Sequence, residues 1–195
     1  MLTLCIDTAY KYLTCALIKD DELLAYKSYE CFKKQSEEVF MCMKEVFEKA
    51  NIDRKAIDSI CISEGPGSYT GVRIAMSIAK VIGEVLPCDL YTISTLRLYA
   101  ANKKNAMVVL NARADRAYVG VYDLDKIILE DTIQKVCDID YSNYEIIGDG
   151  SLLGLADNAP DIPKAFLDTK YLWKKTDNIR FLVPKYLKES ESYLK

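Results

Sequence analysis

Histidine is absent from all 195 residues of the chain. Its absence excludes histidine-based catalytic triads, histidine ligands to zinc and acid–base catalysis by imidazole. Glycine (8) and proline (5) are scarce, which excludes a collagen-like or low-complexity chain. The apolar runs are shorter than the roughly 18 residues that a membrane-spanning helix needs. The N-terminal MLTLCIDTAY includes Asp7 and lacks a basic stretch, so we expect a buried strand there rather than a signal peptide.

The cysteines are widely spaced and form no CxxC pair. An odd number with such spacing argues against a disulfide framework and against a four-cysteine metal site. Most of them lie in apolar runs, where a free cysteine behaves as a small hydrophobic residue. We therefore expect free thiols, no metal and a reducing, cytoplasmic location. The seven cysteines are Cys5, Cys15, Cys31, Cys42, Cys61, Cys88 and Cys137.

The net charge of −3 is unevenly distributed. Acidic side chains predominate in residues 121–169, and basic side chains predominate in residues 170–195. This pattern favours a solvated acidic face and a basic C-terminal helix. A contact of the basic segment with RNA or an acidic partner stays open, although its charge density is low for a nucleic-acid site.

The two halves of the chain share one pattern. Residues 3–24 can be laid on residues 107–128 without a gap, so that Leu4-Cys5-Ile6 falls on Val108-Val109-Leu110 and Asp7 falls on Asn111. Both segments show three extended apolar runs separated by short polar turns. The repeat predicts two similar lobes with a cleft between them, in residues 1–103 and 104–195.

The order of predicted elements indicates an α/β fold. Three strands precede a helix with Ser36 as its N-cap, and a strand at about 57–63 leads through a glycine-rich turn to a helix ending near Leu86. A strand at 88–93, a short helix capped by Ser94 or Thr95, three more strands, a strand near 144–148 and a helical C-terminal third follow. Hairpins followed by strand–helix units imply mixed sheets with flanking helices. The C-terminal segment is then free to pack back on the first lobe.

The run EGPGSYTGVR, residues 64–73, is the strongest candidate for chemistry. A glycine-rich turn that opens a helix presents free N–H groups and a positive dipole to an anion. The turn has no lysine and matches neither the Walker A nor the GxGxxG pattern. Phosphate binding and close packing of helix on sheet are therefore equally good interpretations. The candidate nucleotide-binding residues of this turn are Gly65, Gly67, Ser68, Thr70 and Gly71.

Two further turns could face a nucleotide. Asp7 and Thr8 end the first strand, where a carboxylate and a hydroxyl can hold a magnesium-bound water or a phosphate. The alternative is a turn that these side chains only stabilise. Gly148 and Gly150 follow a strand and could face a base or a ribose, or could form an ordinary strand-to-helix turn.

The two long helices of the first lobe present more apolar surface than one sheet can cover. On the helix at 71–86, Arg73, Ser77, Lys80 and Glu84 share one narrow arc, and the remainder is apolar or glycine. Either the helices cover each other, or they form a subunit interface. The candidate interface residues are Met41, Cys42, Val72, Ala75, Met76, Ala79 and Gly83.

The run EGPGSYTGVRIAMSIAKVIG, with IDTA before it and STLRLYA after it, resembles the TsaB (YeaZ) family. The segments NARADRAYVGVYD, GDG and PKYLK are similar to later markers of that family. The resemblance implies the two-lobed actin-like ATPase (ribonuclease H-like) fold, with a second lobe shortened between Gly150 and Pro184. It further implies a non-catalytic paralogue of the TsaD transferase, whose metal site needs a His-x-x-x-His pair that this chain lacks. In this family Gln35 stands where histidine is common, and Asn111 replaces an acid.

The resemblance also implies partners and a role. It predicts a scaffold for the TsaD-type transferase that forms threonylcarbamoyladenosine on ANN-reading tRNAs, with a TsaE-type ATPase as a third subunit. The family pairs with TsaD, and with itself when alone, through first-lobe helices. The chain would contact tRNA only through the complex, and no membrane is expected. No cofactor is expected beyond possible ATP or ADP at a subunit interface.

Two other function classes stay open. Asp7, Thr8, the Gly65–Gly71 turn and Gly148 with Gly150 would suit a stand-alone ATP-binding or hydrolytic enzyme of the actin-like fold. The missing phosphate-loop lysine, the missing histidine and Asn111 oppose it. A homodimeric RNA-binding module is disfavoured by the mildly acidic net charge.

Overall fold

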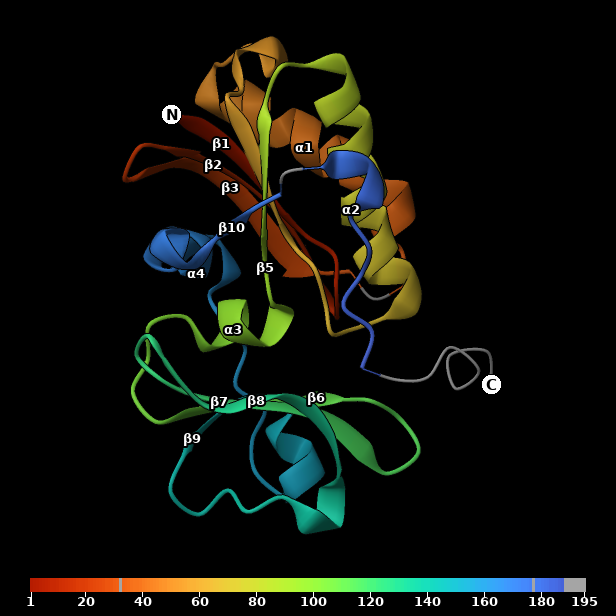
Figure 1. Ribbon diagram of the computed structural model, residues 1–195, viewed down its shortest axis with the longest axis vertical. Helices are drawn as coiled ribbons and strands as arrows, with labels where there is room; N and C mark the ends of the chain where they lie inside the picture. The colour runs from red at the N-terminus through yellow and green to blue at the C-terminus, as the bar shows by residue number, and fades with distance from the viewer. Residues whose placement is uncertain (32, 177, 188–195) are drawn as a thin grey trace.

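A computed structural model describes residues 1–31, 33–176 and 178–187. Its larger sheet has six strands in the order β10-β5-β4-β1-β2-β3 (Figure 1). The first three strands, β1 (Leu2–Asp7), β2 (Tyr12–Lys19) and β3 (Glu22–Glu30), form an antiparallel meander. β4 (Ser59–Ser63) and β5 (Asp89–Ile93) continue the sheet parallel to β1, and the short β10 (Lys174–Lys175) runs antiparallel to β5.

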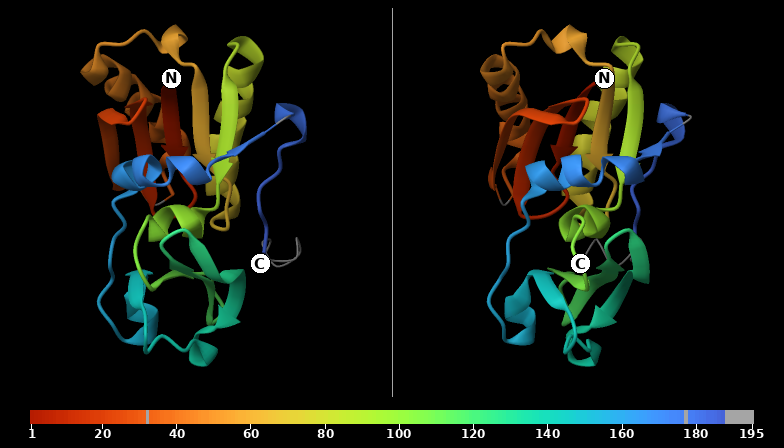
Figure 2. Two further views of the ribbon diagram at one scale, coloured as in Figure 1. Left: turned by 60° about the vertical axis from the view of Figure 1, so that its left-hand side comes forward. Right: turned by 90° about the vertical axis from the view of Figure 1, so that its left-hand side faces the viewer.

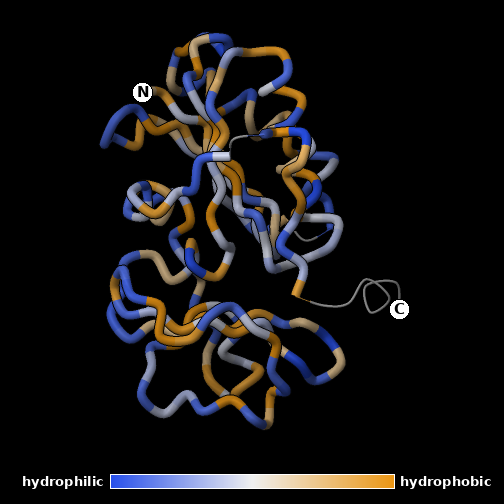
Figure 3. The backbone as a smooth tube through the Cα atoms, viewed as in Figure 1, coloured by the Kyte–Doolittle hydropathy of each residue, from blue (hydrophilic) through white to orange (hydrophobic). Residues whose placement is uncertain are grey.

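Helices cover both faces of this sheet, as the two views of Figure 2 show. α1 (Gln35–Ala50) and α2 (Tyr69–Val85) lie on one face and bury Leu4, Ile6 and Ile60. α4 (Ile162–Asp168) and α3 (Thr95–Ala100) lie on the other face, against Cys5 and Ala16. The central strands β1 and β4 are buried on both faces, which explains their nearly continuous apolar sequences, orange in Figure 3.

The second sheet repeats the beginning of the first in a smaller form. Its order is β8-β7-β6-β9, from β6 (Ala106–Asn111), β7 (Arg116–Asp123), β8 (Lys126–Lys135) and β9 (Glu145–Gly148). β6, β7 and β8 form an antiparallel meander, and β9 pairs parallel with β6 as β4 does with β1. The sequence repeat therefore predicted the topology correctly, and the α/β class with two mixed sheets is confirmed.

The two lobes share a continuous apolar core. α3 lies between them (Figure 1) and packs on β6 and β7, with Tyr99 and Tyr122 almost fully buried. One cluster of buried side chains joins Cys5 and Ala16 of the first sheet to Val108 and Leu110 of the second. All seven cysteines are free thiols. Within the described residues, no helix is both long and apolar enough to cross a bilayer.

The C-terminal part differs from the helical third that the sequence predicts. After β9 the chain forms short 3₁₀ turns, the seven-residue α4 and the strand β10. It returns to the first lobe, where the turn Ile179–Phe181 packs on α2. The predicted cap of α1 is also wrong, because the helix begins at Gln35 and places Ser36 in its first turn. Ser94 caps α3 by accepting a hydrogen bond from the Arg97 amide.

Candidate functional site

The end of β1 supplies two polar side chains that are fully buried. The Asp7 carboxylate accepts hydrogen bonds from the hydroxyls of Ser63 and Tyr99 (2.8 Å for Tyr99) and from the Ala9 amide at 3.1 Å. Burial raises the pKa of the Asp7 carboxyl above its usual value, and these hydrogen bonds oppose the shift only in part. Thr8 donates to the Gly71 carbonyl at 2.7 Å and accepts from the Ala75 amide at 3.2 Å. Both side chains therefore have partners within the lobe.

The glycine-rich turn packs directly on the loop that follows β1. The Ser68 amide donates to the Ala9 carbonyl at 2.7 Å. A Cβ atom on Gly67 would lie 2.2 Å from the Ala9 oxygen, and one on Gly71 would lie 2.2 Å from the Thr8 oxygen. This geometry favours the packing interpretation of the turn, since glycine is needed for the backbones to approach so closely.

The remaining candidate residues of the glycine-rich turn make different contacts. Ser68 caps α2 by accepting from the Gly71 amide at 3.3 Å, and Thr70 is exposed in the first helical turn. Gly65 has a φ of +101°, and a side chain there would meet the Lys185 carbonyl oxygen at 2.8 Å. The turn thus links α2, the β1–β2 loop and the C-terminal segment.

The second lobe meets this region through Asp149, which the sequence analysis did not select. Its buried carboxylate accepts hydrogen bonds from the Tyr10 hydroxyl, from Lys11 Nζ at 2.5 Å and from the Asn111 amide at 2.8 Å. Burial and the Asp149 carboxylate together raise the pKa of the Tyr10 phenol. Burial by itself would lower the pKa of the Lys11 ammonium. The hydrogen bond and the negative charge of Asp149 outweigh the effect of burial, so the pKa of Lys11 is raised. Asp149 therefore ties the second lobe to the first hairpin.

The glycines on either side of Asp149 are required by close backbone contacts. Gly148 has a φ of +96°, and a side chain there would lie 2.5 Å from the Val109 carbonyl oxygen. A Cβ on Gly150 would lie 2.1 Å from the Ala156 oxygen. The predicted GDG turn is thus real, but its central acid is the residue with the polar contacts. No local sequence signal identifies Asp149, because its partners Tyr10 and Lys11 belong to the first hairpin.

A small cavity lies at this junction of the lobes. Its volume is about 80 Å³, and Tyr10, Tyr12, Tyr99 and Asp149 line part of it. Pockets for drug-sized ligands are larger, about 300–1,000 Å³. The fold does bring the candidate nucleotide-binding residues near one another, but their buried polar groups are bonded mainly to the protein itself.

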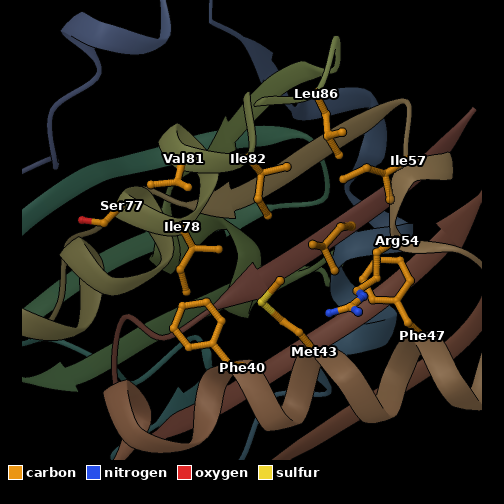
Figure 4. Close-up of a pocket in the computed structure, with 11 residues that line it drawn as sticks. Phe40, Met43, Phe47, Arg54, Ile57, Ser77, Ile78, Val81, Ile82 and Leu86 are labelled. Atoms are coloured by element: carbon orange, nitrogen blue, oxygen red, sulfur yellow. The ribbon is translucent and has the colours of Figure 1, made fainter. Parts of the chain in front are cut away.

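A larger, apolar groove lies between α1 and α2, on the far side of the first sheet. It holds about 360 Å³, with Leu4 of β1 at its floor. Phe40, Met43 and Phe47 line it from α1, and Ile78, Val81, Ile82 and Leu86 line it from α2 and its end (Figure 4). Phe40 and Val81 are 66% and 65% exposed. Such an open apolar surface is typical of a protein-binding face.

Comparison with known proteins identifies the family. A family model described as "TsaD: tRNA N6-adenosine threonylcarbamoyltransferase" matches residues 30–148, more than half of the chain. The chain belongs to this family, in its TsaB (YeaZ) group. It is 30% identical over 127 residues to the "tRNA threonylcarbamoyladenosine biosynthesis protein TsaB" of Buchnera aphidicola from Schizaphis graminum, covering 62% of this chain and 60% of the relative. It is 28% identical over 137 residues to the Bacillus subtilis protein of that name, covering 68% and 60%.

The fold agrees with the family. YeaZ from Pseudomonas aeruginosa superposes with a TM-score of 0.80 over 95% of this chain and 99% of that chain, at 17% identity. The predicted actin-like fold is therefore confirmed. The sequence match spans about 60% of the length of the curated TsaB relatives.

Several predicted interface residues are buried inside the first lobe. Met76 is only 4% exposed and packs in the core with Ala75 and Ala79, so the prediction that it faces outward is wrong. Cys42, on the face of α1 that packs on the first sheet, is also fully buried, and Val72 is 2% exposed. Met41 does face outward, at 56% exposure. Phe40 and Val81, which are not among the predicted interface residues, are exposed apolar side chains on the same two helices.

The small residues of α2 that were predicted to face a partner pack inside the chain instead. Gly71 contacts the Thr8 backbone, and a Cβ on Gly83 would lie 2.5 Å from Ile179 Cδ1. Two residues of the polar arc of α2 contact the C-terminal segment: Glu84 pairs with Arg180 at 2.9 Å, and Lys80 donates to the Arg180 carbonyl at 3.1 Å. The apolar side of α2 that lines the groove remains open, with Val81 65% exposed.

Gln35 and Asn111, which the resemblance marks as unusual, both have hydrogen-bond partners in the structure. Gln35 is buried, and its amide donates to the Tyr10 carbonyl at 2.8 Å, which fixes the start of α1 to the first hairpin. Asn111 uses its side-chain oxygen to accept from the Arg113 amide at 2.7 Å. Both residues therefore support turns at the junction of the lobes.

Proposed function

We propose that this chain is a non-catalytic subunit that binds and activates a TsaD-type transferase, which forms threonylcarbamoyladenosine on ANN-reading tRNAs. The observation that favours this role most is the open apolar groove between α1 and α2. The names of the curated relatives, which refer to tRNA threonylcarbamoyladenosine biosynthesis, give the process.

The absence of catalysis by this chain is supported by its chemistry. The chain has no histidine for a TsaD-type metal site, and the described residues include no cluster of three or more potential metal-ligating side chains. Asp7, the predicted nucleotide-binding carboxylate, is buried and accepts hydrogen bonds from Ser63, Tyr99 and Ala9. We therefore propose that this chain requires no cofactor of its own, and that any ATP or ADP lies at a subunit interface.

The groove would serve both for binding to the transferase subunit and for self-association. Phe40 and Val81 would be removed from water by the transferase subunit in the complex, and by a second copy of this chain when it is alone. Because both partners would use one surface, they compete. A TsaE-type ATPase and tRNA would then contact this chain only within the assembled complex.

The test is co-purification of the untagged chain with the transferase of the same organism, followed by light scattering. The proposal predicts a stoichiometric complex, and it predicts that the transferase dissociates any homodimer. Separate elution of the two proteins at micromolar concentration would contradict the proposal. ATP hydrolysis by the isolated chain at more than about 1 s⁻¹, near the low end for ordinary enzymes, would favour a stand-alone enzyme instead.

A further inference from the structure

One charged residue, Arg54, lines the otherwise uncharged groove between α1 and α2. It belongs to the 3₁₀ turn Arg54–Ala56, which precedes β4. Figure 4 shows its guanidinium group turned into the groove, at the end where Met43 and Phe47 line it. A cation with five N–H donors therefore lies at the edge of a surface made mostly of hydrocarbon.

Arg54 has no partner of its own among the described residues. No hydrogen bond or ion pair of its guanidinium joins it to them, whereas the guanidinium of Arg180 pairs with Glu84. The two nearest acids in sequence face elsewhere: Asp53 accepts from the Lys55 amide at 2.8 Å, and Asp58 accepts from the Leu2 amide at 2.7 Å. In the free chain, water solvates the exposed Arg54 side chain.

Docking of an apolar surface over the groove would remove that water. An unpaired guanidinium in an apolar interface is strongly unfavourable, but a carboxylate opposite it forms a strong two-pronged hydrogen-bonded pair. We propose that the transferase-type partner carries an Asp or Glu side chain among its apolar contact residues, and that Arg54 selects this partner by pairing with that carboxylate. This inference rests on the proposed function and specifies the chemistry of the partner.

A second copy of this chain is a poorer source of the carboxylate. On the same two helices, Glu45 pairs with Lys27 at 2.5 Å, Glu48 with Lys44 at 3.6 Å and Glu84 with Arg180 at 2.9 Å. Glu38 accepts a hydrogen bond from the Tyr29 hydroxyl at 2.8 Å, so among the acids of these two helices only Glu37 has no partner among the described residues. The charge pattern therefore favours a different protein over self-pairing.

The test is Arg54→Met, measured by calorimetric titration with the transferase subunit. Met keeps an apolar side chain of similar length, so the substitution removes the charge and leaves the groove apolar. We expect binding to weaken about tenfold or more, since each tenfold corresponds to about 1.4 kcal/mol, and its salt dependence to diminish. Lys55→Met is the matched control, because Lys55 is an exposed cation of the same turn that does not line the groove; we expect its affinity to stay within about twofold.

The outcomes separate this inference from the proposed function. If the unaltered chain fails to bind the transferase, the proposed function itself fails, and this inference with it. If the unaltered chain binds and Arg54→Met binds equally well or more tightly, the partner offers no carboxylate and only this inference is overturned. If Arg54→Met weakens self-association but not binding to the transferase, the carboxylate belongs to a second copy, which contradicts the assignment. Thermal melting of each variant establishes that the fold is kept.

Discussion

Replacing Gly67 by alanine tests whether the glycine-rich turn exists for packing. The added Cβ would lie 2.2 Å from the Ala9 carbonyl oxygen and 3.1 Å from its carbonyl carbon. Ordinary contact begins near 3.4 Å, so the two backbones would have to separate by roughly 1 Å. That movement would break the Ser68 to Ala9 hydrogen bond, which is 2.7 Å long.

The cost follows from these two effects. Overpacking costs about 1–3 kcal/mol and a lost hydrogen bond about 1 kcal/mol, so we expect Gly67→Ala to lower the free energy of unfolding by roughly 2–4 kcal/mol. For a domain of this size each 1 kcal/mol lowers the melting temperature by about 2–4 °C. Differential scanning calorimetry should therefore show a decrease of about 5–15 °C.

Gly154→Ala provides the matched control. Gly154 has a φ of +75° but no atom within 4 Å of the added Cβ, so only the backbone penalty of about 1 kcal/mol applies. If Gly67→Ala melts no lower than Gly154→Ala, the contact with Ala9 is not tight and the packing interpretation is refuted. If Gly67→Ala instead abolishes ATP binding by the chain without changing its melting temperature, the turn is a nucleotide site.

Three further predictions concern the junction of the lobes. Asp149→Ala removes the acceptor of the Tyr10 hydroxyl and one of the two acceptors of the Asn111 amide, so it should lower the free energy of unfolding by roughly 3 kcal/mol in urea titration. Asp157→Ala, at an exposed carboxylate, should lower it clearly less, and equal effects would show that Asp149 does not tie the lobes together. Because the folded-state pKa of Asp7 lies above its ordinary value of 3.8, the folded protein holds that proton more tightly than the unfolded chain does, so the native chain should lose stability relative to Asp7→Asn as the pH rises above about 3.8; a pH-independent difference would contradict this. The isolated chain should hydrolyse ATP at less than about 1 s⁻¹ with or without added divalent metal in a phosphate-release assay, and faster turnover would refute the absence of catalysis.

The sequence predicted the arrangement of strands more accurately than the surfaces of helices. A short apolar run bounded by turn residues can be recognised as a buried strand from the sequence alone. The repeat of Leu4-Cys5-Ile6 by Val108-Val109-Leu110 indicated two similar sheets, as the structure shows. β10 was missed because its two lysines have no strand pattern and only the edge of β5 defines it.

Which side chains of a helix are buried depends on packing with distant parts of the chain, and the local sequence does not reveal that packing. Met76 belongs to the core because the sheet beneath α2 and the C-terminal segment beside it together cover most of that helix. The contacts of Glu84 and Lys80 on α2 with Arg180 likewise depend on a segment about a hundred residues away in the chain. Asp149 was overlooked because its partners Tyr10 and Lys11 are more than a hundred residues away in the chain.

The central claim is that the groove between α1 and α2 is the surface that binds the transferase subunit. The most direct measurement is a calorimetric titration of that subunit with Phe40→Glu and Val81→Glu, alongside Leu155→Glu on the second lobe. Phe40, Val81 and Leu155 are all exposed, so each variant should keep its fold. Phe40 and Val81 lie at the end of the groove away from Arg54 (Figure 4), so the transferase subunit would bury a carboxylate there at a cost of several kcal/mol. Both groove variants should therefore bind at least about a hundredfold more weakly, while Leu155→Glu binds like the unaltered chain. Unchanged affinity in both groove variants would contradict the account.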